Sequence, residues 1–142
     1  MVRWLGAVQA QDYPGALWAI GVRLPQATEA AVEQAIAQRR IVRTWPMRGT
    51  LHFVATADVR WMLALLTPRI MAGSVRRLQR DYAITPSVMS RCRRALERAL
   101  RDGPVPRPAV YRALESARIA TGGQRGLHIL WRLAQELSLI HI

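Results

Sequence analysis

The stretch Val8–Arg23 reads Val-Gln-Ala-Gln-Asp-Tyr-Pro-Gly-Ala-Leu-Trp-Ala-Ile-Gly-Val-Arg. Asp12 is a favourable N-cap residue and Pro14 falls in the first helical turn, where its missing N–H costs nothing, so a helix is expected to follow. If the residues before it are extended, Gln9 and Gln11 point the same way, because strand side chains alternate with a period of two. Two neutral amides would then converge near a helix N-terminus, which favours anions and phosphates. The spacing predicts a nucleic-acid-binding or water-positioning site, and alone it does not indicate an enzyme.

The charge of the chain is strongly positive. The 142 residues contain 21 basic and nine acidic side chains, giving a formal net charge of +12. On a folded domain such an excess indicates a polyanion-binding protein, usually a nucleic-acid-binding one, although a compositional bias towards arginine is an alternative. Every basic residue is arginine. The absence of lysine excludes Schiff-base chemistry by a lysine of this segment and a Walker-type phosphate loop.

The cysteine and histidine content gives no indication of a metal or another cofactor. Cys92 is the only cysteine and lies among arginines, where it is expected to be a structural residue. His52, His128 and His141 are scattered and lack the spacing of metal ligands. We therefore expect no cofactor and no metal. The sequence also lacks a membrane-spanning apolar run and a signal peptide at its start, so we expect a cytoplasmic protein with no membrane partner.

The first half of the chain predicts two helices and a hairpin. Apolar spacing indicates helices over Tyr13–Arg23 and Glu29–Arg39, and Ile41–Val54 alternates like two strands around a turn. This is the order of a winged helix without its first helix, in which the second helix would be the recognition helix and the hairpin the wing. We therefore expect a partial first winged-helix domain over residues 1–56.

The predicted recognition helix and wing carry a cluster of cations. We expect Arg39, Arg40, Arg43 and Arg48 to contact DNA phosphates, although each of them could equally belong to a solvated basic face. His52 is a candidate second base or phosphate contact, and its ordinary alternative is a solvent-facing strand position. Of the two tryptophans nearby, Trp45 and Trp61, we expect core packing rather than base stacking.

The second half of the chain predicts helices only. Two connecting helices, Ala57–Leu66 and Arg69–Tyr82, are expected on either side of Pro68, within residues 57–84. Residues 85–142 then repeat a three-helix pattern that is typical of a winged helix but lacks the wing. The fold class expected is mainly α with a small β-hairpin, in a tandem winged-helix architecture, and the chain is expected to be a fragment. The three helices expected in the last segment are Ser87–Arg101, Pro108–Ser116 and Gln124–Leu137.

Two segments resemble the bacterial winged-helix DNA-binding family that contains the AlkZ-like DNA glycosylases. They are Leu-Gly-Ala-Val-Gln-Ala-Gln-Asp-Tyr-Pro-Gly-Ala-Leu-Trp-Ala at 5–19 and Arg-Thr-Trp-Pro-Met-Arg-Gly-Thr-Leu-His-Phe-Val at 43–54. The catalytic signature of that family is Gln, an aliphatic residue, then Gln or Asp. Gln9 and Gln11 match its two ends, and Ala10 is a small version of the usual aliphatic residue. The resemblance implies that Gln9 and Gln11 are catalytic.

The resemblance also implies an activity and a partner. Characterised members hydrolyse the N-glycosidic bond of alkylated purines, including purines in interstrand cross-links, so the expected partner is damaged double-stranded DNA. A bacterial enzyme of this kind would associate with the nucleoid when bound to DNA. The fragment alone is expected to be inactive.

Three alternatives remain open from the sequence. Asp12 is a rival acid or base, although an N-cap role is the more ordinary one for it. A non-catalytic winged-helix module, such as a transcriptional regulator, would share the positive charge. A scaffold that binds a partner protein through apolar helix faces would not show the steep salt dependence of DNA binding.

Overall fold

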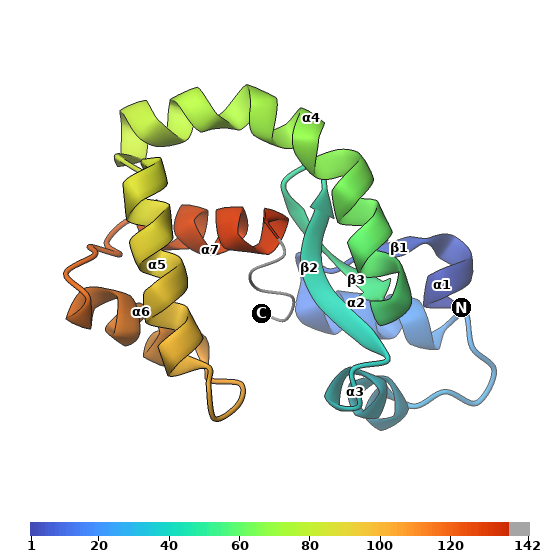
Figure 1. Cartoon of the computed structure of the whole chain (residues 1–142). Helices are drawn as coiled ribbons and strands as arrows, with labels where there is room; N and C mark the ends of the chain where they lie inside the picture. Colours follow the sequence, from blue (N-terminus) through green and yellow to red (C-terminus); the bar gives the residue numbers. More distant parts are fainter. Residues whose placement is uncertain (137–142) are drawn as a thin grey trace. The chain divides into compact units, whose positions relative to one another are not determined.

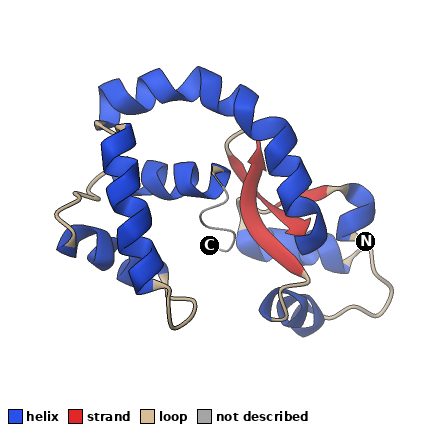
Figure 2. Ribbon diagram, viewed as in Figure 1, coloured by secondary structure: helices blue, strands red, loops and turns tan. Residues whose placement is uncertain are grey.

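The computed structural model describes residues 1–136, which form mainly helices and one small sheet (Figures 1 and 2). The mainly helical class with a small hairpin, expected from the sequence, is confirmed. The predicted end of the last helix at Leu137 and the position of His141 lie outside the described residues. The elements in chain order are α1 (Val2–Leu5), β1 (Ala7–Gln9), α2 (Tyr13–Gly21), α3 (Glu29–Ala37), β2 (Ile41–Met47), β3 (Thr50–Ala55), α4 (Thr56–Tyr82), α5 (Pro86–Ala99), α6 (Arg107–Ser116) and α7 (Arg125–Gln135).

Local capping fixes where several helices begin. The Asp12 carboxylate accepts a hydrogen bond from the Gly15 N–H at 3.2 Å, so the predicted N-cap of α2 is confirmed. The Thr28 and Thr85 hydroxyls cap α3 and α5 in the same way. Each cap satisfies one of the N–H groups that a helix N-terminus leaves without an intrahelical partner.

The sheet has three antiparallel strands in the order β1-β3-β2, so β1 adds a strand that pairs with one side of the hairpin. Gln9 lies opposite His52, and His52 lies opposite Thr44 on its other side. These three residues therefore share one face of the sheet, whereas Val8 and Phe53 point to the other face. The order α1-β1-α2-α3-β2-β3 is that of a winged-helix-like domain, with a helical turn α1 that the sequence analysis did not expect.

The connecting segment differs from the prediction. One continuous helix, α4, runs from Thr56 to Tyr82 with Pro68 inside it, so the expected break at Pro68 is wrong. A proline inside a helix costs about 3 kcal/mol because it lacks an N–H and crowds the preceding turn. Helix-favouring residues on both sides, such as Leu66 and Arg69, continue the helix through it. No described helix is long and apolar enough to cross a membrane.

The described chain divides into two compact units, and the division falls within α4, between Ile70 and Met71. In the first unit, α2 and α3 pack against one face of the sheet. Their core contains Leu17, Ile20, Val32 and Phe53, each no more than 4 % exposed. In the second unit, α5 contacts both α6 and α7. The described part of this unit, residues 71–136, contains helices and no strand.

Candidate functional site

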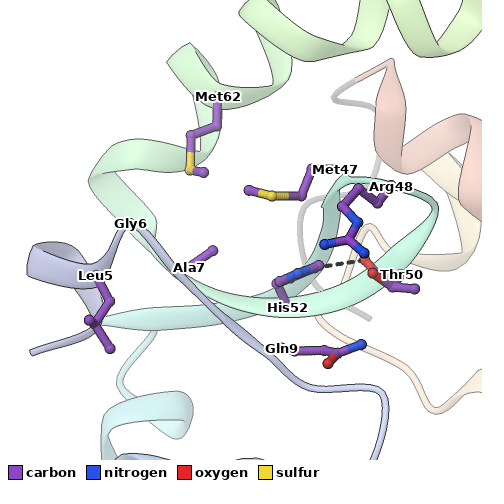
Figure 3. A pocket seen from close by; sticks show the side chains of 9 residues that line it. All are labelled: Leu5, Gly6, Ala7, Gln9, Met47, Arg48, Thr50, His52 and Met62. Atoms are coloured by element: carbon purple, nitrogen blue, oxygen red, sulfur yellow. Dashed lines mark hydrogen bonds between the residues drawn. The ribbon is translucent and has the colours of Figure 1, made fainter.

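An open pocket lies on the face of the sheet that carries Gln9 and His52 (Figure 3). Its volume is about 560 Å³. Strand β1 contributes Gln9, β3 contributes His52, and Met62 of α4 points towards the same space. The pocket therefore combines an amide, an imidazole and a thioether from three different elements. Its further lining residues are Leu5, Gly6, Ala7, Met47, Arg48 and Thr50.

The two glutamines of the motif occupy different positions. Strand β1 ends at Gln9 and the chain bends at Gln11, so the condition under which both glutamine side chains would point the same way is not met. The Leu51 N–H donates to Gln11 Oε1 at 3.0 Å, and the Leu51 carbonyl accepts from the Ala10 N–H at 2.8 Å. The Leu51 N–H is thus satisfied by the side-chain oxygen of Gln11, and not by a backbone carbonyl as in a continued strand pair. Gln9 lines the pocket, and Gln11 is not among the lining residues.

Arg43 holds the same loop from the other side. Its guanidinium donates to the Ala10 carbonyl at 2.9 Å and to the Gln11 carbonyl at 3.2 Å, and it lies 5.5 Å from the centre of the Tyr13 ring. Burial lowers the pKa of Arg43 from its usual high value. Arg43 pairs with Phe53 in the ladder, so it lies on the face opposite the Gln9–His52 pocket. Arg43 therefore contacts the loop at Ala10 and Gln11, which we call the motif loop, whereas its expected role was phosphate binding.

The other three predicted phosphate contacts are exposed. Arg39 and Arg40 follow the end of α3, and Arg48 forms the hairpin turn with Gly49. Both turn residues have positive φ, 56° for Arg48 and 70° for Gly49, which is typical of a two-residue type I′ turn. The turn presents the Arg48 side chain at the tip of the wing and at the rim of the pocket (Figure 3).

The predicted recognition helix has little positive charge of its own. The exposed residues of α3 include Glu29 and Glu33, and no arginine lies between Glu29 and Ala37. Carboxylates on this face repel phosphates. The cations of this region are therefore concentrated after the helix and in the wing, and not along the helix.

His52 is buried, with 8 % of its surface exposed, so the solvent-facing alternative is wrong. Its Nδ1 lies 2.9 Å from the Thr50 carbonyl oxygen. Trp45 is buried as expected, but Trp61 is 53 % exposed, and its indole N–H donates to Asp58. The expectation of core packing for Trp61 is therefore wrong.

Cys92 is fully buried in α5, as expected for a structural cysteine. Burial raises the pKa of its thiol, and the nearby positive charges of Arg125, Arg91 and Arg93 act in the opposite direction. Within residues 1–136, no three histidine, cysteine or acidic side chains are grouped closely enough to hold a metal ion.

Sequence reasoning missed several parts of the site. Met47, Thr50 and Met62 line the pocket but were not predicted as site residues, although Met47 and Thr50 lie within the family-like segment 43–54. Leu51 acts through its backbone groups alone, so its side chain carries no signal. Met47 and Thr50 reach the pocket from the hairpin and Met62 from α4, so only the folded chain brings these residues together.

The family model for the AlkZ-like DNA glycosylases matches residues 2–142. The chain belongs to this family. The searches of curated proteins and of solved structures found no match. The residues that the AlkZ-like resemblance singled out, Gln9 and Gln11, thus lie in a domain with the strand order of a winged helix. Family membership supports a DNA glycosylase type of function, which is a hydrolase activity in DNA repair with DNA as the substrate.

Proposed function

We propose that this protein is a monofunctional DNA glycosylase that binds damaged duplex DNA through its winged-helix-like domain. It hydrolyses the N-glycosidic bond of alkylated purines, including purines in interstrand cross-links. The position of Gln9 carries the proposal, because this residue of the family signature lines an open pocket on a strongly basic chain.

The chemistry suits a substrate whose leaving group is already charged. An N7-alkylated purine carries a positive charge and departs with little acid assistance. What remains is to position a water and to stabilise an oxocarbenium-like sugar. A glutamine amide has no useful pKa near neutrality, but its carbonyl dipole can orient water and stabilise a developing cation. In this proposal Gln9 provides such a dipole directly.

Gln11 is the second proposed catalytic residue. Its amide oxygen accepts from the Leu51 N–H, and that bond fixes the loop that follows Gln9. In the bound state Gln11 either contributes a second dipole or acts by keeping Gln9 in position.

DNA contacts are assigned to the exposed cations and to the rim of the pocket. We propose phosphate contacts for Arg39, Arg40 and Arg48, which are exposed around the wing. Arg43 remains a candidate, but its guanidinium already donates to the carbonyls of Ala10 and Gln11. His52 contributes at the pocket and not at the exposed surface.

The test is excision from a duplex with a single N7-methylguanine. The full-length protein that contains this chain is compared with its Gln9→Ala and Gln11→Ala variants, and with Gln79→Ala, an exposed glutamine of α4, as the matched control. We expect an abasic product from the wild type and from Gln79→Ala. The Gln9→Ala variant should lose on the order of 10²-fold in rate while it keeps its affinity for the duplex. A duplex with an N7-linked cross-link then tests the cross-link part of the proposal.

Other outcomes contradict the proposal in different ways. Tight, salt-sensitive binding without an abasic product would indicate a DNA-binding module, such as a transcriptional regulator. Binding that is weak and insensitive to salt would exclude both DNA-binding functions and favour a protein scaffold.

A further inference from the structure

We propose that His52 accepts the proton of the attacking water at the Gln9 pocket, through its Nε2 atom. This inference rests on the proposed glycosylase function and deepens it, because it names the group that takes the proton. The two glutamine amides cannot do so.

The orientation of the imidazole ring is the first observation. His52 Nδ1 lies 2.9 Å from the Thr50 carbonyl oxygen, and the contact is drawn in Figure 3. A carbonyl oxygen only accepts hydrogen bonds, so Nδ1 carries the hydrogen in the neutral ring. Nε2 then holds the lone pair. Because only 8 % of His52 is exposed, the surrounding protein restricts the ring.

The position of the ring relative to Gln9 is the second observation. His52 and Gln9 are register partners in the β1–β3 ladder, and both line the pocket (Figure 3). Directly opposed residues of an antiparallel pair have their Cβ atoms about 4.5–5.5 Å apart on the same face. A water placed between the two side chains would have an amide dipole on one side and the imidazole on the other.

The charges around the pocket select His52 as the proton acceptor. Among the described lining residues the guanidinium of Arg48 is the one charged group, and β1, α1 and α4 contribute neutral side chains to the lining. Asp58 on α4 instead pairs with Arg3 at 3.7 Å and with the Trp61 indole. Among the described residues that line the pocket, His52 is thus the one side chain of a type that serves as a general base.

The step balances as a simple hydrolysis. The water oxygen forms a bond to C1′ of the deoxyribose while the bond from C1′ to the purine nitrogen breaks. The electron pair of that bond goes to the purine and cancels the positive charge of the alkylated ring. The proton of the water goes to Nε2 of His52 and is then returned to solvent.

The test compares wild type, His52→Gln and the matched control His128→Gln in single-turnover excision of N7-methylguanine. We expect His52→Gln to be about 10²-fold slower, with duplex affinity within about twofold of wild type. The wild-type rate should fall as the pH is lowered, and the rate of His52→Gln should lose that dependence. A structural role would lower the melting temperature without flattening the pH profile.

Several results would overturn the inference. Excision by His52→Gln at the wild-type rate, or with a parallel pH profile, would contradict it while leaving the glycosylase function intact. Absence of excision by the wild type would instead remove the proposed function. Nitrogen-15 NMR of the wild-type chain tests the orientation independently of activity and of the variant's folding. We expect the Nδ1–H tautomer for His52, and a protonated Nε2 in the neutral ring would overturn the inference.

Discussion

Gln9 and His52 lie directly opposite each other on neighbouring antiparallel strands, and both side chains line the same pocket. The two residues are far apart in the sequence, and only the addition of β1 to the hairpin brings them together. The loop after Gln9 is held by hydrogen bonds from Arg43 and Leu51, which come from the two strands of that hairpin. The geometry of the candidate site therefore depends on the hairpin.

Replacement of Gly15 by alanine should destabilise the first unit. A Cβ atom at Gly15 would lie 2.4 Å from Asp12 Oδ2, so the carboxylate that caps α2 would have to move. We expect Gly15→Ala to be less stable than Gly21→Ala by about 1 kcal/mol, the usual value of an N-cap, because both variants share the gain of an alanine in a helix, and chemical denaturation measures the difference. Gly21→Ala on the same helix is the control, because a Cβ there meets nothing within 4 Å. Equal stability of the two variants would contradict the prediction.

Arg48→Asn should raise stability and weaken DNA binding together. Arg48 has a φ of 56°, which costs an L-residue with a long side chain more than it costs asparagine. We expect the free energy of unfolding to rise by several tenths of a kcal/mol. The slope of log affinity against log salt concentration for duplex binding should decrease by about the amount that one phosphate contact contributes. Arg80→Gln serves as the control, because Arg80 already pairs with Asp81 at 2.7 Å. An unchanged salt slope in Arg48→Asn would exclude a phosphate contact.

Arg43→Lys distinguishes loop support from phosphate binding. Lysine keeps the charge but lacks the planar fork that reaches the carbonyls of Ala10 and Gln11. We expect the free energy of unfolding to fall by about 1–3 kcal/mol. The salt dependence of duplex binding should stay close to wild type. If Arg43 binds phosphate, Arg43→Ala should reduce the salt slope by about one contact, and binding titrations at several salt concentrations would show it.

The second unit should lose stability at mildly acidic pH through His128. Burial lowers the pKa of His128, and the positive charge of Arg77 adds to the effect. The unfolded chain therefore binds a proton more readily than the folded one as the pH falls below about 6.5. Neutral His128 therefore contributes to the stability of the folded unit above that pH. This contribution is lost as the pH falls through the lower pKa that His128 has in the folded state.

The measurement is the melting temperature of wild type and His128→Phe at pH 7.5 and pH 5. Phenylalanine keeps an aromatic ring beside Tyr82, whose ring centre lies 4.2 Å from that of His128. The variant should lose less stability than the wild type over this interval. A larger loss in the variant would show that His128 favours the folded state when protonated.

Cys92 should be unreactive in the folded protein. The side chain is fully buried, and burial raises its thiol pKa despite the nearby arginines. Modification by a thiol reagent then requires local or global opening, so we expect it to be at least about 10³-fold slower than in denaturant. Absorbance of the released chromophore follows the reaction. Rapid native labelling would show that α5 opens easily.

Local physics explains which elements the sequence determined by itself. The Asp12 and Thr28 caps, the hairpin around Gly49 and the helical segments depend on neighbours a few residues apart, and the structure has them. The unexpected continuation of α4 through Pro68 shows that the local rule for proline did not decide the end of this helix.

Only the tertiary structure decided the site. Arg43 reaches the Ala10 carbonyl across 33 positions of sequence, and the Leu51 N–H reaches Gln11 across 40. These bonds turn Arg43 towards the motif loop and hold the Gln11 side chain beside Leu51. They depend on which strand pairs with which and in what register, and a backbone N–H or carbonyl carries no sequence signal. The sequence therefore identified the motif, and the pairing of β1 with β3 placed Gln9 beside His52.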